Sequence, residues 1–116
     1  MPEPERGDVW LVRFPFTELS TAKVRPALVL AVHGEDIIVM GIFSRVPDVA
    51  FRETWLLVEE THPERSLTGF RKTSLLKGEK IAVVHESVFQ RRLGWLPFDI
   101  MQGVTPALKK TLHISP

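Results

Sequence analysis

Two apolar runs with a polar segment between them constrain the fold of this chain more than any other feature of its sequence. Residues 9–14 and 26–32 are rich in β-branched and aromatic side chains, as strands are. The polar segment between them is too long for a tight hairpin loop. It ends in Arg25, directly before Pro26, and proline suits the first residue of a strand because no ladder N–H is needed there. A basic loop between two rigid strands is a suitable place to hold a ligand.

Short apolar runs separated by polar breaks continue through the middle of the chain. Four of them have the length of strands: 37–43, 54–58, 73–76 and 80–84. The first follows a four-residue break that contains Gly34, which predicts a hairpin with residues 26–32. The triplet Lys77-Gly78-Glu79 has the composition of a turn between the last two runs. Residues 59–72 are charged and include a proline and a glycine, which predicts a surface loop.

The last part of the chain has the period of a helix. Four apolar side chains recur at three- and four-residue spacing and so share one helical face: Met101, Val104, Leu108 and Leu112. Pro106 does not suit a helix interior, because it removes a hydrogen bond and clashes with the preceding turn. Thr105 and Pro106 therefore predict an N-cap and a first helical residue. We expect a short helical turn at 97–103 and a second helix from Pro106, or one kinked helix.

The order of these elements favours one architecture. Short strands close together in sequence, followed by a helix, are typical of a mainly β fold. We expect a small, antiparallel, partly closed barrel with the C-terminal helix over one end. No internal repeat or low-complexity linker divides the chain, so we expect a single domain over residues 1–116.

Composition limits the class of function. The formal net charge is +1, so bulk charge does not hold the protein on nucleic acid, and any site for a polyanion must be a local patch. The absence of cysteine rules out disulfides and thiolate metal sites and fits a reducing compartment. The polar N-terminus lacks the apolar run of a signal peptide, and no stretch is apolar enough to span a membrane. We therefore expect a soluble, cytoplasmic protein.

Several motifs occur in an order that is typical of one protein family. The triplet Gly7-Asp8-Val9, the step Phe14–Thr17 and the run Arg25–Leu30 resemble the opening of the MazF/PemK family of toxins, and residues 69–76 and 92–96 continue the likeness. The resemblance implies an SH3-like barrel of the CcdB/MazF type that forms a homodimer. It also implies a metal-independent endoribonuclease without cofactors, which cuts single-stranded RNA and is neutralised by an antitoxin that occupies the RNA groove.

Cleaving RNA without a metal requires groups that take the proton from the 2′-hydroxyl, protonate the departing 5′-oxygen and stabilise the charged phosphorane. Arg25 is the best candidate for the stabilising donor, because a guanidinium is always charged and grips phosphate oxygens two at a time. The alternative is a structural arginine that pairs with a carboxylate at the base of the loop. The position of Arg25 beside the polar loop and the family resemblance favour the catalytic role.

The resemblance implies a catalytic threonine where the third strand ends, but this chain has Phe43 there, followed by Ser44. Successive side chains of a strand point to opposite faces, so a shift of one residue matters. Either a bulge turns Ser44 onto the catalytic face, or the hydroxyl is lost and activity is in doubt. A serine that simply ends the strand is the structural alternative.

Some members of the family carry an arginine and an aspartate at the positions of Lys77 and Glu79. Lys77 is expected to bind phosphate, and Glu79 is a candidate catalytic base if burial raises its pKa. An ordinary solvated turn is the alternative. Four more residues are candidates for RNA contacts in or near the two loops: Ser20, Thr21, Lys23 and Arg45. No cluster of side chains in the sequence predicts a metal site.

Two other functions remain open. The first is a binding module on the same barrel that inhibits a protein target, as the related CcdB toxins inhibit DNA gyrase, since one scaffold hosts many functions. The second is an inactive relative that only pairs with its antitoxin. Arg25 favours the nuclease, because phosphate chemistry needs a fixed cation, whereas Phe43 in the place of a hydroxyl favours a binding protein.

Overall fold

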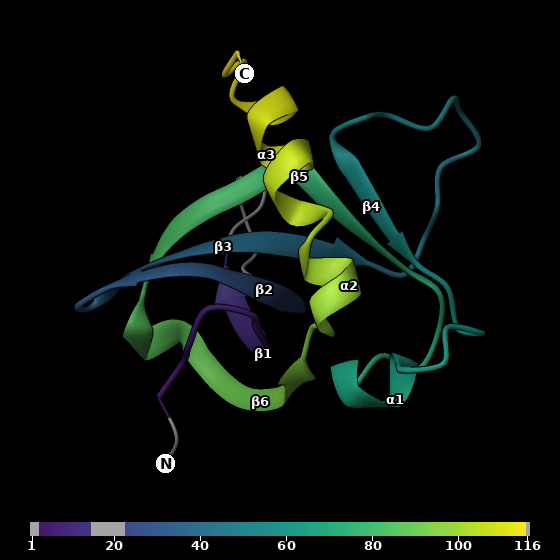
Figure 1. Cartoon of the computed structure of the whole chain (residues 1–116). Coiled ribbons are helices and arrows are strands. Elements are labelled where there is room, and N and C mark those ends of the chain that lie inside the picture. The colour runs from purple at the N-terminus through teal and green to yellow at the C-terminus, as the bar shows by residue number, and fades with distance from the viewer. Residues whose placement is uncertain (1–2, 15–22, 116) are drawn as a thin grey trace.

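A computed structural model describes residues 3–14 and 23–115 of the chain (Figure 1). The described residues form one antiparallel sheet with the strand order β4-β5-β3-β2-β1-β6. Its strands are β1 (Asp8–Phe14), β2 (Lys23–His33), β3 (Asp36–Phe43), β4 (Trp55–Val58), β5 (Ser74–His85) and β6 (Phe89–Trp95). This architecture confirms the expected mainly β fold.

The hairpin expected around Gly34 is present, and Gly34 has a φ of 61° in the turn between β2 and β3. β2 begins at Lys23, so Pro26 lies inside the strand rather than at its start. The ladder between β2 and β3 begins only at Ala27, which leaves β1 as the one strand paired with Pro26 in the described sheet. A proline is tolerated at a position that has a strand on one side only.

The helices are short and mostly follow the last strand. They are α1 (Arg65–Thr68), the 3-10 helix η1 (Glu86–Val88), α2 (Phe98–Met101) and α3 (Val104–Thr111). In the described part of the chain, none of them is long and apolar enough to cross a membrane. α1 and the buried Phe70 lie in the segment 59–72, which is therefore more ordered than the expected loop.

The C-terminus forms two separate helices, as expected, rather than one kinked helix. The second helix starts before Pro106, where it was expected to begin. α3 begins at Val104 with Gly103 as its N-cap, so the cap expected at Thr105 is wrong. Pro106 is the third helical residue, where its missing N–H costs little because the N–H groups of the first turn have no partner within a helix. Val104 is buried as expected, whereas Leu112 is exposed.

The turn expected at Lys77-Gly78-Glu79 is wrong, because these residues form a bulge inside the continuous strand β5. The ladder between β3 and β5 skips residues 77–80 of β5. The Gly78 N–H donates to the carbonyl of Thr54 (2.9 Å), and a Cβ at Gly78 would meet the Thr111 hydroxyl of α3. A glycine between two charged residues suits a bulge as well as a turn, so composition does not separate the two.

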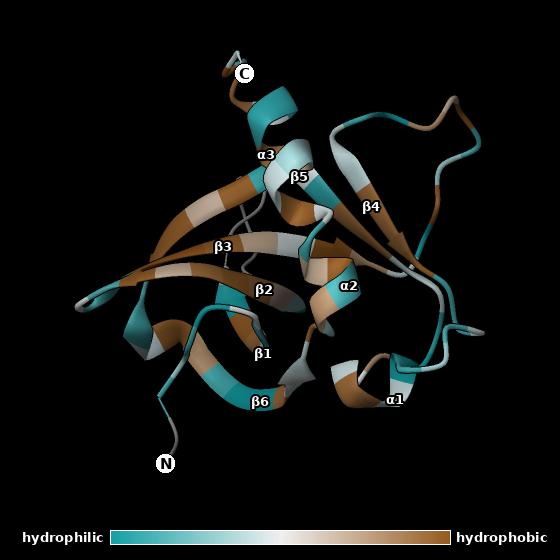
Figure 2. Ribbon diagram, in the orientation of Figure 1, coloured by the Kyte–Doolittle hydropathy of each residue, from teal (hydrophilic) through white to brown (hydrophobic). Residues whose placement is uncertain are grey.

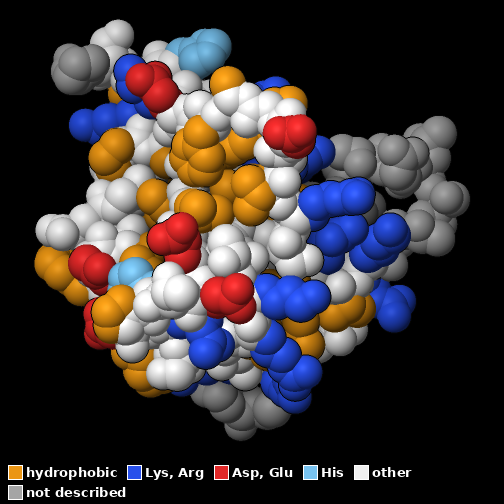
Figure 3. All heavy atoms as spheres, turned by 90° about the vertical axis from the view of Figure 1, so that its right-hand side faces the viewer, with side chains coloured by type: hydrophobic (Ala, Val, Ile, Leu, Met, Phe, Trp, Pro, Cys, Tyr) orange, Lys and Arg blue, Asp and Glu red, His pale blue; other side chains and the backbone are white. Residues whose placement is uncertain are grey.

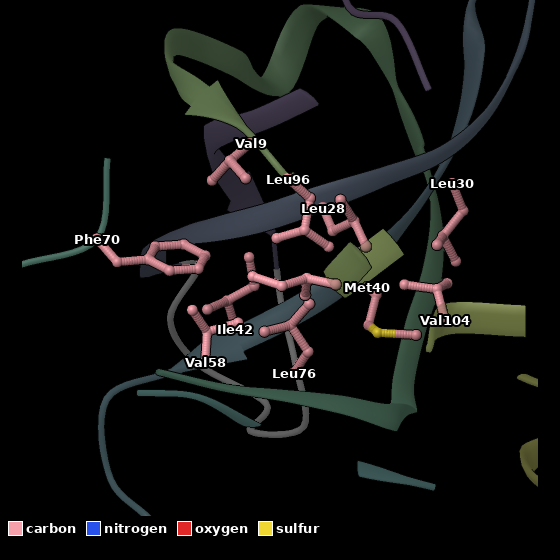
Figure 4. Packing of buried hydrophobic residues seen from close by; sticks show 11 residues of the cluster. Val9, Leu28, Leu30, Met40, Ile42, Val58, Phe70, Leu76, Leu96 and Val104 are labelled. Atoms are coloured by element: carbon pink, nitrogen blue, oxygen red, sulfur yellow. The ribbon is translucent and has the colours of Figure 1, made fainter. Parts of the chain in front are cut away.

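The twisted sheet has an apolar cluster on each face, and its central strands are the most hydrophobic part of the ribbon (Figure 2). On one face, side chains from the sheet meet those of α2, α3 and the segment after α1 (Figure 4). This cluster includes Leu28, Met40, Phe70, Leu76 and Val104. The other cluster is built around Trp10, Val29 and Val39, with residues of η1 and β6 packed against it.

The sheet is not closed into a complete barrel by strand pairing. β4 and β6 are its edges in the described part of the chain, and α1 with its C-cap Gly69 packs on β6 instead. The contact is between backbones, because a Cβ at Gly94 would lie 2.1 Å from the Leu67 carbonyl oxygen and one at Gly69 would lie 2.6 Å from that of Leu93. Two facing glycines thus allow this close approach. The expected SH3-like barrel therefore describes the fold approximately.

Candidate functional site

A groove with a cavity volume of about 400 Å³ opens where the first residues of β2, the end of β3 and the segment after α1 meet. Apolar side chains, among them the buried Phe70, form part of its wall. Its charged lining residues are all cations: Arg25, Arg71, Lys72 and Arg91. Among the described residues, no carboxylate lines this groove, so its local charge favours an anion even though the net charge of the chain is only +1.

The distribution of charge over the surface agrees with this. On the face shown in Figure 3, Lys and Arg side chains gather on one half of the molecule, and acidic side chains lie mostly on the other. The concentration of cations is therefore local, as the sequence analysis required of any polyanion site.

Arg25 is held at the groove by the sheet. It lies opposite Val12 of β1 in the ladder, and its side chain is half-buried. The Cζ atom of the guanidinium lies 5.3 Å from the centroid of the Phe43 ring, a cation–π contact. The expected cation is thus fixed by the backbone of β2 and by an aromatic ring, on the wall of an anion-attracting groove.

Phe43 and Ser44 both line this groove at the end of β3. The ladder to β5 reaches Phe43, which pairs with Leu75, and Ser44 is the exposed residue that follows the strand. The irregularity in this ladder lies between Met40 and Ile42, before the end of β3. The phenyl ring, rather than the hydroxyl, is the group in contact with Arg25.

Lys77 extends the site across the sheet. Its Nζ atom lies 4.8 Å from the centroid of the Phe43 ring and 5.7 Å from that of Trp55, its partner in the ladder with β4. The guanidinium of Arg52 lies over the same Trp55 ring at 5.3 Å. Cations and rings therefore alternate in the order Arg25, Phe43, Lys77, Trp55, Arg52, and we call these five side chains the cation–ring row.

Glu79 anchors the end of this row. Its carboxylate accepts hydrogen bonds from Arg52 (Nη1, 3.0 Å), the Thr54 hydroxyl (2.6 Å) and the indole N–H of Trp55 (3.1 Å). Partial burial acts to raise the pKa of Glu79, but the hydrogen bonds from Thr54 and Arg52 and the charge of Arg52 hold this pKa below its ordinary value. The raised pKa considered for a catalytic base is therefore not found.

A second, smaller cavity of about 270 Å³ lies at this end of the row. Arg52, Trp55, Lys77 and Glu79 line it together with Lys80. The row thus runs from the groove beside Arg25 to this cavity, across four neighbouring strands or the residues next to them.

The other predicted contacts are placed less centrally. Lys23 is exposed at the first residue of β2, and Arg45 is exposed just after β3; neither lines the groove or the second cavity. Ser20 and Thr21 lie outside the described residues. The sequence analysis missed the cations Arg52, Arg71, Lys72 and Arg91. Basic pairs at 71–72 and 91–92 were a signal for three of them, but only the fold places Arg71, Lys72 and Arg91 on the same groove as Arg25.

The Gly7-Asp8-Val9 motif has a structural role away from the groove. Asp8 is buried, and its carboxylate accepts hydrogen bonds from the Trp10 indole (3.2 Å), the Glu5 backbone N–H (3.0 Å) and Arg92 (3.1 Å). Gly7 has a φ of 92°, which is favourable for glycine alone. The motif therefore fixes the start of β1, and with it the strand that pairs with Arg25.

Comparisons with known proteins connect this geometry to a family. The family model of the PemK-like, MazF-like toxins of type II toxin–antitoxin systems matches residues 5–112. A comparison with curated protein sequences found no match. Several solved structures are similar to this chain over almost their whole length.

The first is an endoribonuclease from a mycobacterial species in complex with its cognate antitoxin, with 16% identity, coverage of 97% of this chain and 98% of that chain, and a TM-score of 0.73. The second is the Mycobacterium tuberculosis toxin MazF-mt6, with 16% identity, coverage of 94% and 99%, and a TM-score of 0.71. The third is MazF from Deinococcus radiodurans, with 19% identity, coverage of 98% and 100%, and a TM-score of 0.71. At these identities, the likeness shows a shared fold.

Proposed function

Since this chain belongs to the PemK-like, MazF-like family of toxins of type II toxin–antitoxin systems, we propose that it is an endoribonuclease that cleaves single-stranded RNA without a metal ion. One observation carries the proposal: the half-buried Arg25 stands on the wall of a groove whose described charged residues are all cations. Two similar structures, an endoribonuclease and a MazF toxin, support it at the level of the family.

The proposed reaction follows from the groups in the groove. The 2′-hydroxyl of a nucleotide gives its proton to water as its oxygen attacks the adjacent phosphorus, and the bond from phosphorus to the 5′-oxygen breaks as that oxygen takes a proton from water. The products are a 2′,3′-cyclic phosphate and a 5′-hydroxyl. Arg25 would stabilise the charge that develops on the phosphoryl oxygens through two parallel hydrogen bonds. Ser44, at the end of β3, would donate a further hydrogen bond to the phosphate.

The remaining charged residues would bind the RNA rather than react with it. Lys77 would bind phosphate, and Arg71, Lys72 and Arg91 would neutralise the phosphates on either side of the scissile bond. The lowered pKa of Glu79 keeps its carboxylate ionised at neutral pH, and its three hydrogen bonds hold Arg52 and Trp55. We therefore propose that Glu79 supports the RNA site by positioning these two side chains.

An antitoxin is the proposed protein partner. The similar structures include an endoribonuclease with its cognate antitoxin and a MazE–MazF complex from Deinococcus radiodurans. A cationic groove suits an acidic segment of such a partner, which would compete with RNA for Arg25.

The cleavage reaction is expected to proceed in EDTA. The purified chain, incubated with a long RNA and excess EDTA, should yield fragments with 5′-hydroxyl ends, because Arg25 supplies the charge stabilisation that a metal would otherwise give. Labelling of fragment ends by polynucleotide kinase without prior phosphatase treatment checks this. An absolute need for Mg²⁺, or 5′-phosphate ends, would contradict the mechanism.

One rival function has a specific observation in its favour. Phe43 stands where the family resemblance implies a catalytic hydroxyl, as it would in a protein that binds a target without cutting RNA. Intact RNA after the incubation just described, with and without Mg²⁺, would favour this non-catalytic module.

We also propose that the chain forms a homodimer. Large apolar side chains remain exposed on the described surface, among them Phe98 (78%), Val83 (66%) and Trp95 (45%). Exposed aromatic and aliphatic groups of this kind are enriched in interfaces between subunits. Static light scattering at micromolar concentration should report about twice the mass of the chain, and a monomer would count against the dimer.

A further inference from the structure

The ring of Phe43 makes cation–π contacts with two side chains of the proposed site, Arg25 and Lys77. The Arg25 guanidinium and the Lys77 ammonium both lie within 5.3 Å of its centroid, although they come from β2 and β5, the strands on either side of β3. The negative face of an aromatic ring attracts cations and gives each of them a preferred position.

The position of Lys77 is also fixed from its other side. Its ammonium lies over the Trp55 ring, and the indole N–H of Trp55 donates to Glu79. Glu79 accepts two further hydrogen bonds, from Arg52 and Thr54, so the ring of Trp55 has a fixed place on the sheet. Lys77 is therefore held between one ring anchored by Glu79 and another that it shares with Arg25.

Packing in the core does not account for Phe43. The residue belongs to neither apolar cluster of the sheet, and it is only partly buried on the wall of the groove. Leucine at this position would lack the aromatic face that contacts Arg25 and Lys77.

We infer that Phe43 is a positioning residue, whose ring holds Arg25 and Lys77 so that both cations face one phosphate. Lys77 is then the second phosphate-contacting cation of the site, and this pair replaces the threonine hydroxyl that the family resemblance implies at the end of β3. The inference rests on the proposed function for its substrate, which is the phosphodiester of a single-stranded nucleic acid.

The test compares two substitutions of Phe43 that differ in their π system. Phe43→Leu keeps an apolar side chain but removes the aromatic face, and Phe43→Trp keeps that face. We expect Phe43→Leu to lower kcat for RNA cleavage by about tenfold, because both cations lose their fixed positions. Phe43→Trp should retain the rate within about threefold. Leu112→Ala, at an exposed position after α3, is the control and should leave the rate unchanged. Melting temperatures of all variants establish that they fold.

A double-mutant cycle separates positioning from a general effect on the site. If Phe43 acts through Lys77, the loss in Phe43→Leu/Lys77→Ala should be clearly smaller than the product of the two single losses. Independent roles predict that the two losses multiply. Multiplied losses, or equal rates for Phe43→Leu and wild type, would overturn the inference. Faster cleavage by Phe43→Thr would overturn it as well, since the missing hydroxyl would then be the limiting group.

A binding measurement keeps the inference distinct from the proposed function. A single-stranded DNA oligonucleotide lacks the 2′-hydroxyl and is not cut, and fluorescence anisotropy reports its affinity for each variant. Phe43→Leu should weaken binding several-fold, and Phe43→Trp should not. If wild type fails to cleave RNA while this difference in binding persists, the proposed function fails and the positioning role stands. Equal binding by the Leu and Trp variants would refute the positioning role whether or not RNA is cleaved.

Discussion

Replacing Arg25 by alanine should lower the rate of RNA cleavage by about 10²–10³, which is the usual cost of removing one preorganised donor from a transition state. The guanidinium is fixed by β2 and by the Phe43 ring, so it requires little reorganisation when charge develops on the phosphate. Single-turnover cleavage of a fluorescent RNA measures the effect. The melting temperature should change little, because the half-buried Arg25 belongs to neither apolar cluster.

Three companion variants define what Arg25 contributes. Arg25→Lys should restore only part of the rate, since an ammonium does not make the planar two-pronged contact with phosphate. Ser44→Ala should cost about tenfold or less, the usual range for one hydrogen bond. Lys109→Ala, which removes an exposed cation from α3, controls for net charge and should have no effect. Cleavage by Arg25→Ala at the wild-type rate would show that the proposed site is wrong.

Replacing Gly94 of β6 by alanine should strongly destabilise the fold. Its Cβ would lie 2.1 Å from the Leu67 carbonyl oxygen and 2.8 Å from the carbonyl carbon of Thr68, and both are backbone atoms that cannot rotate away. We expect a loss of about 3 kcal/mol, at the upper end of the usual cost of overpacking. For a domain of this size, the melting temperature should fall by roughly 10 °C. Chemical denaturation monitored by tryptophan fluorescence gives the free energy of unfolding.

Gly103→Ala is the matched control for this prediction. Its Cβ would come closest to Leu56 Cδ1 (2.6 Å), the end of a flexible side chain, and the backbone there has an ordinary φ of −77°. A change of less than about 1 kcal/mol is expected, because the leucine can adopt another rotamer. Equal stabilities of the two alanine variants would show that the contact between α1 and β6 is not close-packed in solution.

Most of the strands could be predicted from local patterns. The apolar runs at 9–14 and 37–43 and the break around Gly34 correspond to β1, β3 and the hairpin, because alternation and turn residues act over a few positions. Arg25 could be selected as a candidate because it stands between a polar loop and a strand. Its place on the groove wall agrees with that choice, and its catalytic role stays a prediction.

The remaining features depend on contacts between distant residues. β6 is not evident from the sequence, because the arginines at 91 and 92 interrupt its apolar pattern. Its hydrogen bonding to β1 holds this segment as a strand instead. The bulge at Gly78 has the composition of a turn, since the same residue types suit both. The direction of the pKa shift of Glu79 could not be predicted from the sequence. The three hydrogen-bond donors to its carboxylate come from residues 52–55, more than twenty positions earlier in the chain.

Because α3 packs against the bulge of β5, a sequence change in one of these two segments limits the residues that evolution can accept in the other. A Cβ at Gly78 would overlap the Thr111 side chain, more than thirty residues further along the chain, while Lys77 and Glu79 face the other way toward the cation–ring row. Homologous chains should therefore keep the central glycine of this triplet. Where that glycine is replaced, the residue equivalent to Thr111 should have become smaller, so that covariation of these two positions would mark this helix–strand contact.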